Sequence, residues 1–196
     1  AAGVAKLPSF QTSHGHFSLW QGDTGEPKYT VYALEGMLEA KRAGIAVDAE
    51  MQKSALRALT DWSAAQANLA AHPDRTTVAL AAYVLAAMDQ PDFVLNGRLF
   101  EARQGLSLFA QCYLLRALSL ANAPPAQVNA MVDLIAARAT VQGDTARLPE
   151  LPEYAEDWWP SAHDVRTTAA GLSALLTARP QHPLVPQLAE IGRAHV

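Results

Sequence analysis

Hydrophobic and polar positions along this chain repeat one helical pattern four times. The copies align on Tyr32, Tyr83, Tyr113 and Ala170, and each reference position is followed after two residues by a leucine. A small residue and then a large apolar one come next, two and three residues beyond that leucine. Residues four apart stack on one helix face, so each copy carries a notch where a neighbouring helix can approach closely. The four copies predict a repeating, all-helical array.

The repeat helices alternate with amphipathic ones. Pro27 suits the first turn of a helix and Gly44 its end, so the first repeat helix is predicted from about Pro27 to Ala43. Asp48 is expected to cap an amphipathic helix that runs to about Ala65. The same alternation predicts buried helices over 73–88, 106–121 and from about 161, and amphipathic helices from about Pro91, Pro124 and Pro183. The segments 11–27 and 144–160 are expected to be loops.

Buried helices that alternate with amphipathic ones are what two concentric layers of helices require. The pattern therefore predicts an all-α fold, and specifically an α/α toroid of helical hairpins, as in terpenoid cyclases and prenyltransferases. A four-helix bundle fits less well because all its helices would be amphipathic. An open α-solenoid is the main structural alternative. The length of 196 residues suits a single domain.

Composition narrows the classes of partner. Half of the chain is apolar, yet the longest apolar run, 78–88, is only about half of what crosses a bilayer. The net charge of -4 and the lack of a Lys/Arg cluster argue against a nucleic-acid or anionic-membrane surface. Proteins or small molecules are the expected partners.

Few residues in the sequence suggest a reactive or metal-binding site. Cys112 is the single cysteine and lies within an apolar helix, so we expect a buried core thiol and no internal disulfide or thiolate metal site. His14 and His16 offer two nitrogens to a metal but no third ligand, which favours a surface loop over a metal site. Large aromatic residues in the two loops are expected to be structural anchors that pack against the repeat helices: Phe17, Trp20, Trp158 and Trp159.

Four blocks of sequence resemble one family. GHFSLWQGDTGEPKYTVYALEGMLEAKRAGIAVD, over 15–48, resembles the stretch after the thioester site in bacterial alpha-2-macroglobulins, with a Gly-x-Phe-x-x-Trp loop before a Thr-x-Tyr helix. Three later stretches of this chain resemble, in order, later blocks of the same domain: RLFEARQGLSLFAQCYLLRAL, the ATVQGD stretch and WWPSAHDVRTTAAGLSALLTARPQHPLVPQL. The resemblance spans roughly 7–188.

The resemblance implies an α/α toroid within a large secreted or periplasmic protease inhibitor of bacterial defence. In that family a bait region is cut, the molecule rearranges, and an internal thioester can capture the attacking protease. The expected partners are other domains of a longer parent chain and target proteases, with membrane contact only through a lipid anchor elsewhere in that parent. No cofactor or metal is implied.

The thioester itself is not encoded here. It needs a Cys-x-Glu-Gln sequence, because the cysteine thiolate is acylated by that glutamine, whereas Cys112 is followed by Tyr113, Leu114 and Leu115. Residues 1–196 are therefore expected to be one partial thioester domain that lacks the thioester helix, with the ring incomplete at both ends. A parent from a thioester-free branch is the alternative.

Relatives of the complement type place a histidine near the thioester to direct acyl transfer. His72 is the nearest match in order and is the candidate for that position, although a plain loop histidine is the simpler interpretation. His163 and His182 show no partner for acid or base work in the sequence.

Toroids also serve enzymes, so a carbohydrate-active hydrolase or lyase is the alternative function. It would need two carboxylates at the mouth of the ring, and acids do occur at the predicted starts of buried helices: Glu26, Asp74, Asp157 and Asp164. Acids at helix N-termini usually serve as caps. The zinc ligands of prenyltransferases and the Asp-rich motif of terpene cyclases have no counterpart in the sequence. We therefore predict no catalytic residue.

Overall fold

The computed structural model describes residues 2–66, 74–150 and 163–193. Within these ranges the chain is mostly helical, and the predicted all-α class is confirmed. The N-terminal segment forms α1 (Ala2–Lys6) and the short 3-10 helix η1 (Leu7–Phe10). The repeat helices are α2 (Pro27–Arg42), α4 (Arg75–Ala87), α6 (Leu108–Leu120) and α8 (His163–Ala178). The helices that follow them are α3 (Ala49–Ala64), α5 (Phe93–Glu101), η3 (Arg103–Gly105), α7 (Pro125–Ala136) and α9 (Leu184–Arg193).

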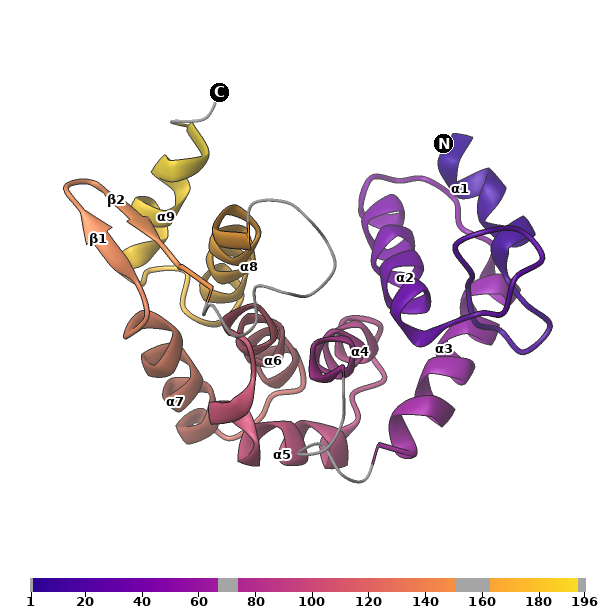
Figure 1. The fold of residues 1–196 in the computed structure, drawn as a ribbon, viewed down its shortest axis with the longest axis horizontal. Coiled ribbons are helices and arrows are strands. Elements are labelled where there is room, and N and C mark those ends of the chain that lie inside the picture. The colour runs from indigo at the N-terminus through magenta and orange to yellow at the C-terminus, as the bar shows by residue number, and fades with distance from the viewer. Residues whose placement is uncertain (1, 67–73, 151–162, 194–196) are drawn as a thin grey trace.

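The helices form two rows that follow an open arc (Figure 1). α2, α4, α6 and α8 make the inner row, and each packs on the next. α3, α5, α7 and α9 make the outer row, and each packs on the inner helix that precedes it. The first and last described helices, α1 and α9, lie on opposite arms of the arc (Figure 1). This arrangement has the alternation of inner and outer helices that the hydrophobic pattern predicts.

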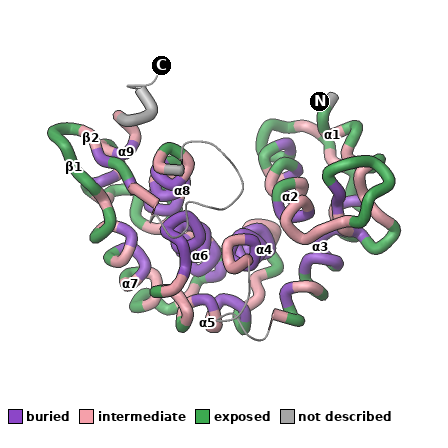
Figure 2. The backbone as a smooth tube through the Cα atoms, viewed as in Figure 1, coloured by how far each residue is buried: buried purple, intermediate pink, exposed green. Residues whose placement is uncertain are grey.

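Burial separates the two middle inner helices from the rest (Figure 2). Every residue from Thr77 to Ala86 in α4 is buried, and α6 is buried almost throughout. Both contain many small residues and no charged residue in their buried stretches, so neighbours can pack on all sides. α2 and α8 form the two walls of the arc and keep exposed apolar side chains, among them Tyr32, Val165 and Leu176.

Helix ends follow the predicted caps with small shifts. The side chain of Asp48 accepts a hydrogen bond from the Met51 N–H at 2.7 Å, and Gly44 adopts a φ of +71°, which ends α2. The buried helix predicted from Pro73 starts at Arg75, because Asp74 caps it by accepting from the Thr77 N–H at 2.9 Å. Pro73 itself lies outside the described residues. The helix predicted from 106 starts at Leu108, with Ser107 as its cap.

A β-hairpin occupies a segment for which no strand was predicted. β1 (Thr140–Gln142) pairs antiparallel with β2 (Thr145–Arg147), in the register Gln142↔Thr145. Gly143 at the turn has a φ of +60°, which matches the right-handed twist of a two-residue hairpin. Tertiary contact stabilises this short element, since β2 packs against α9.

The chain after β2 packs closely on α8, and this contact depends on Gly171. A Cβ atom at Gly171 would lie 2.0 Å from Cδ1 of Leu148 and 3.7 Å from Sγ of Cys112. Leu148 is fully buried, and its N–H donates to Oγ1 of Thr168 at 3.0 Å. The absence of a side chain at Gly171 thus lets the segment after the hairpin approach the inner row.

Candidate functional site

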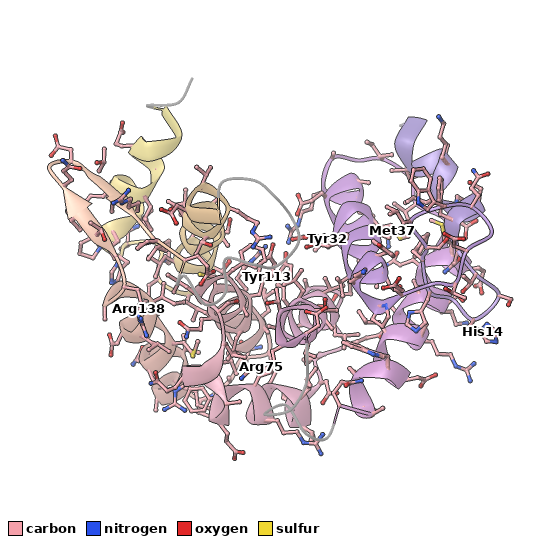
Figure 3. All side chains as sticks on the ribbon, viewed as in Figure 1. His14, Tyr32, Met37, Arg75, Tyr113 and Arg138 are labelled. Carbon is pink, nitrogen blue, oxygen red and sulfur yellow. The ribbon has the colours of Figure 1, made fainter. Side chains whose placement is uncertain are left out.

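One face of α6 carries aromatic and basic side chains that contact the neighbouring inner helices. Phe109, Tyr113 and Arg116 are spaced four and three residues apart, so they lie along one side of this helix. Figure 3 places Tyr113 on the inner side of the arc, with Tyr32 of α2 across from it. Because α6 is otherwise uncharged and largely buried, a charged side chain on it requires specific partners.

Arg116 lies among two rings and one carboxylate. Its guanidinium carbon is 3.7 Å from the ring centroid of Tyr83 and 5.3 Å from that of Tyr113. Its Nη2 donates a hydrogen bond to the Tyr83 hydroxyl. Its Nη1 is 3.8 Å from Oε1 of Glu35, which is an ion-pair distance but too long for a hydrogen bond. Arg116 thereby joins α6 to both α4 and α2.

Arg166 of α8 makes one similar ring contact with α6. Its guanidinium carbon is 4.3 Å from the ring centroid of Phe109. The Phe109 and Tyr113 rings pack edge to face with centroids 4.9 Å apart, and Tyr113 and Tyr83 do the same at 5.4 Å. A continuous series of contacts therefore crosses the four inner helices, and we call it the aromatic–arginine row: Glu35, Arg116, Tyr83, Tyr113, Phe109 and Arg166.

The row leaves guanidinium donors unfilled. The Nε atoms of Arg116 and Arg166 are buried and have no hydrogen-bond partner among the described residues. Over the same residues, Arg166 makes its ring contact but neither an ion pair nor a hydrogen bond. A guanidinium carries five N–H donors. Two buried N–H donors of the row therefore have no acceptor among the described residues.

Burial governs ionisation along the row. It raises the pKa of the Glu35 carboxyl, and the nearby positive charge of Arg116 offsets part of that rise. Burial also raises the pKa of the Tyr83 and Tyr113 hydroxyls. Both tyrosines therefore remain neutral around pH 7, and the row presents fixed cations against uncharged rings.

Cys112 is the buried core thiol that the sequence predicts. Its exposed fraction is 0%, and burial raises the pKa of the thiol, with the Glu150 carboxylate adding to the rise. A thiolate is the nucleophilic form, so Cys112 is held in its unreactive form.

The aromatic residues predicted as structural anchors differ in burial. Phe17 is 2% exposed and packs in the core. The prediction that Trp20 is buried is wrong, since 68% of it is exposed. Its backbone carbonyl accepts from Ser18 Oγ at 2.7 Å and from the Asp23 N–H at 3.3 Å, and this turn directs the side chain to solvent. Trp158 and Trp159 lie outside the described residues.

The histidines occupy loops and caps. His14 is exposed, whereas His16 is half-buried with its Nδ1 3.0 Å from Thr30 Oγ1. Burial lowers the pKa of His16, and the neighbouring His14 lowers it further. The Nδ1 of His182 accepts a hydrogen bond from the Leu184 N–H at 3.2 Å, at the start of α9. His72 lies outside the described residues, and His163 is the first residue of α8.

The acids considered for sugar chemistry have structural contacts. Glu26 pairs with Lys28 at 3.0 Å, and Asp74 caps α4. Asp164 accepts from the Glu150 N–H at 3.1 Å, which ties the chain after the hairpin to α8. Asp157 lies outside the described residues.

Sequence reasoning did not single out Glu35, Arg116, Glu150 or Arg166. A signal existed for Arg116, since it is the one charged residue within an apolar repeat helix and follows two aromatic residues at helical spacing. Arg166 gave no comparable signal, because its ring partner comes from another helix.

The described residues contain no group of three or more His, Cys, Asp or Glu side chains placed to hold a metal ion. Their helices include none with the length and apolarity needed to cross a bilayer.

Comparison with known proteins gives a consistent result, although no family model matches the chain. Alpha-2-macroglobulin of Xylella fastidiosa is 43% identical over 60 residues, which are 30% of this chain and 4% of that protein. Salmonella alpha-2-macroglobulin reacted with methylamine has a similar fold over 98% of this chain, with a TM-score of 0.72 and 20% identity. The chain resembles bacterial alpha-2-macroglobulins. The resemblance inferred from the four sequence blocks is thereby confirmed.

Escherichia coli alpha-2-macroglobulins have the same fold. The native protein from domain MG7 to the C-terminus matches 96% of this chain with a TM-score of 0.67 and 18% identity. The trypsin-activated protein matches 98% with a TM-score of 0.69 and 16% identity. This chain spans 30% and 13% of those two structures, and 12% of the Salmonella alpha-2-macroglobulin. It thus corresponds to a small part of each.

Proposed function

We propose that residues 1–196 are a single partial thioester domain, without the thioester helix, from a bacterial alpha-2-macroglobulin-like endopeptidase inhibitor. The observation that carries this proposal is the agreement of two independent matches. A 60-residue sequence match and a fold match over 96% or more of the chain both lead to bacterial alpha-2-macroglobulins. The open arc of helical hairpins fits an α/α toroid that further helices would close.

The proposed role of this part is structural and interactive rather than catalytic. Its cysteine is buried with a raised thiol pKa, so it is unsuited to nucleophilic attack. Two acids that a hydrolase would need, Asp74 and Asp164, have structural contacts instead. The chain contributes an ordered inner row whose two walls are available to neighbouring parts of a larger molecule.

The proposed partners are other domains of the parent chain and the proteases that it traps. The activation of the Escherichia coli protein by trypsin supports protease targets. By the same analogy we place the parent in the periplasm or outside the cell, with any lipid anchor elsewhere in its sequence. His72 remains a proposed position for directing acyl transfer in the parent.

The test uses the full-length polypeptide that contains this chain. Intact mass and free thiols are measured before and after methylamine, a small amine that opens thioesters. We expect one methylamine to be incorporated and one new thiol to be released beyond Cys112, since the thioester would lie outside residues 1–196. Unchanged mass and thiol content would remove the thioester from the proposal and leave a thioester-free relative.

Protease trapping is tested separately on the same polypeptide. Limited trypsin cleavage is expected to leave the bound trypsin active on small peptide substrates while blocking its access to large protein substrates. Full trypsin activity on protein substrates after cleavage would contradict the inhibitor function.

A further inference from the structure

The outer helix α5 contains a dipeptide that can react with itself. Asn96–Gly97 is the one Asn-Gly sequence in the 196-residue chain, and the other three asparagines precede leucine or alanine. Asn96 is 3% exposed, and neither its Oδ1 nor its Nδ2 has a hydrogen-bond partner among the described residues. We propose that Asn96 is a site of spontaneous deamidation, which α5 blocks while it is helical and whose product then prevents α5 from repacking. This proposal is independent of the inhibitor function.

The reaction joins the Asn96 side chain to the backbone of the next residue. The nitrogen of Gly97 bonds to Cγ of Asn96, the Cγ–Nδ2 bond breaks, and ammonia leaves with the proton of the Gly97 amide. Water then adds to one carbonyl of the five-membered imide, and the ring opens to aspartate or isoaspartate. Glycine favours the first step, because it has no Cβ to crowd the approach and its backbone is the least restricted.

The helical backbone of α5 keeps the reacting atoms apart. Both residues lie inside the helix, where backbone N–H groups donate to carbonyls four residues back and the dihedral angles stay near helical values. Ring closure requires the Gly97 nitrogen to turn toward Cβ of Asn96, which the helical ψ angle of Asn96 prevents. Deamidation therefore requires that α5 opens locally.

Several features of α5 favour local opening. The helix is nine residues long, and its buried residues are Leu95, Asn96 and Leu99. Phe93 and Val94 in its first turn are 67% and 63% exposed. Asparagine and glycine are weak helix formers, and a buried amide without partners is unfavourable. A helix with so few buried contacts belongs to the low-stability end of a fold.

Either product of the reaction fits α5 poorly. The aspartate form places a carboxylate where the Asn96 side chain finds no donor among the described residues. A buried charge without a partner is strongly unfavourable. The isoaspartate form adds a methylene to the backbone, which the helical hydrogen-bond pattern does not accommodate. A chain that has deamidated while α5 was open therefore cannot restore the original packing.

Peptide mapping by mass spectrometry tests the reaction on the 196-residue chain. The chain is incubated at mildly alkaline pH in native buffer and in guanidinium chloride. In denaturant we expect Asn96 to deamidate ahead of Asn122 and Asn129, which both precede alanine. In native buffer Asn96 should react about tenfold or more slowly than in denaturant, because only the opened fraction reacts. Equal rates for Asn96 in the two buffers, or no lead over the other two asparagines, would overturn the proposal.

Gly97→Ala is the matched variant for the chemical step. Nothing lies within 4 Å of a Cβ atom built at Gly97, so the folded chain can accept alanine there. The added methyl group should slow the deamidation of Asn96 in denaturant. An unchanged rate in denaturant would contradict the role of Gly97.

Three substitutions test the fate of the product by urea unfolding. Asn96→Asp should lower the urea midpoint at neutral pH, and the loss should shrink at acidic pH, where the carboxyl is protonated. Asn96→Leu has the same branched shape without polar atoms and should lower the midpoint less than Asn96→Asp at neutral pH. Asn129→Asp is the exposed control on α7 and should change the midpoint little.

The midpoints decide whether charge at position 96 matters. A midpoint of Asn96→Asp equal to that of the parent at neutral pH would contradict the proposal. An equal loss in Asn96→Leu would contradict it too, since shape rather than charge would then be responsible. If Asn96→Asp does not fold at neutral pH while Asn96→Leu does, the proposal is supported.

Discussion

Phe17 and Trp20 lie three residues apart in one loop and have opposite environments. The Phe17 N–H donates to Thr30 Oγ1 at 2.9 Å, and its carbonyl accepts from the Glu26 N–H at 2.8 Å. These bonds fix the backbone beside α2, so the ring enters the core. Trp20 lies in the turn beyond that point and faces solvent. At the scale of single residues, backbone attachment rather than aromatic character decides burial.

Alanine substitution should lower the stability of the chain far more at Phe17 than at Trp20. Phe17→Ala is expected to lower the free energy of unfolding by about 3–5 kcal/mol, because a filled core site becomes a cavity. Trp20→Ala should change it by less than about 0.5 kcal/mol, as for other exposed sites. Urea unfolding of both variants beside the parent measures the difference. Equal losses would show that the loop packs differently.

His16 is tied to the same network through Thr30. The Thr30 hydroxyl donates its one proton to the Glu26 carbonyl at 2.8 Å and accepts from the Phe17 N–H. The Thr30 Oγ1 atom also lies 3.0 Å from His16 Nδ1. Since the hydroxyl has no second proton to donate, it accepts this hydrogen bond too, and His16 therefore carries its proton on Nδ1. The second ring nitrogen is the one that titrates.

This arrangement predicts a specific pH dependence. Burial, reinforced by His14, lowers the pKa of His16 in the folded chain, so the unfolded chain binds the proton more readily. The stability contributed by neutral His16 is present above its ordinary pKa and is lost as the pH falls through the folded-state pKa. Urea unfolding should thus show less loss between neutral and mildly acidic pH for His16→Asn than for the parent. An equal loss in the variant would contradict the shift.

At the scale of elements, a distant carboxylate completes the start of α6. Oε1 and Oε2 of Glu150 accept from the N–H groups of Leu108 and Phe109 at 2.8 and 2.9 Å. Oε2 also accepts from the Thr167 hydroxyl at 3.2 Å. A negative charge at this helix N-terminus satisfies free N–H groups and interacts favourably with the helix dipole. One side chain therefore holds α6, α8 and the chain after the hairpin together.

Removing this carboxylate should cost stability. Glu150→Ala is expected to lower the free energy of unfolding by about 1–3 kcal/mol, because buried N–H donors lose their acceptors. Glu101→Ala is the matched control, since Glu101 is exposed at the end of α5 and should change stability by less than about 0.5 kcal/mol. Thermal or urea unfolding gives both values. A neutral Glu150→Ala result would mean that Ser107 alone is a sufficient cap.

Elements with local signals were predictable, and those without were not. The bounds of α2 and α3 follow from Pro27, Gly44 and Asp48, which act within their own helices. The β-hairpin was missed because its strands are short and β2 is stabilised by packing on α9. The aromatic–arginine row was missed for the same reason, since its contacts join four separate helices.

At the scale of the whole molecule, the arc buries its only cysteine between two helices of the inner row. Cys112 lies at the contact of α6 with α8, near Gly171 and the segment after β2. Access to the thiol therefore requires that the inner row opens. The state of this thiol reports on the integrity of the whole arc.

The single thiol of the 196-residue chain should accordingly react differently in the folded and in the denatured chain. We expect a disulfide reagent to leave Cys112 almost unmodified in the folded chain and to titrate one thiol after denaturation, because the thiol is buried and its pKa is raised. Methylamine should not change the intact mass, since no Cys-x-Glu-Gln sequence is present. Rapid modification under native conditions would show that the inner row opens readily.

The sequence by itself determined the helical class, the order of the helices and their alternation between buried and amphipathic types. These properties follow from local hydrogen bonding, caps and the spacing of apolar residues, all within one turn or one helix. Only the tertiary structure decided that Trp20 faces solvent, that Glu150 caps α6, and that Arg116 and Arg166 belong to one row. Each of these depends on groups from segments far apart in the chain, and the distance between such groups is set by the packing of the helices.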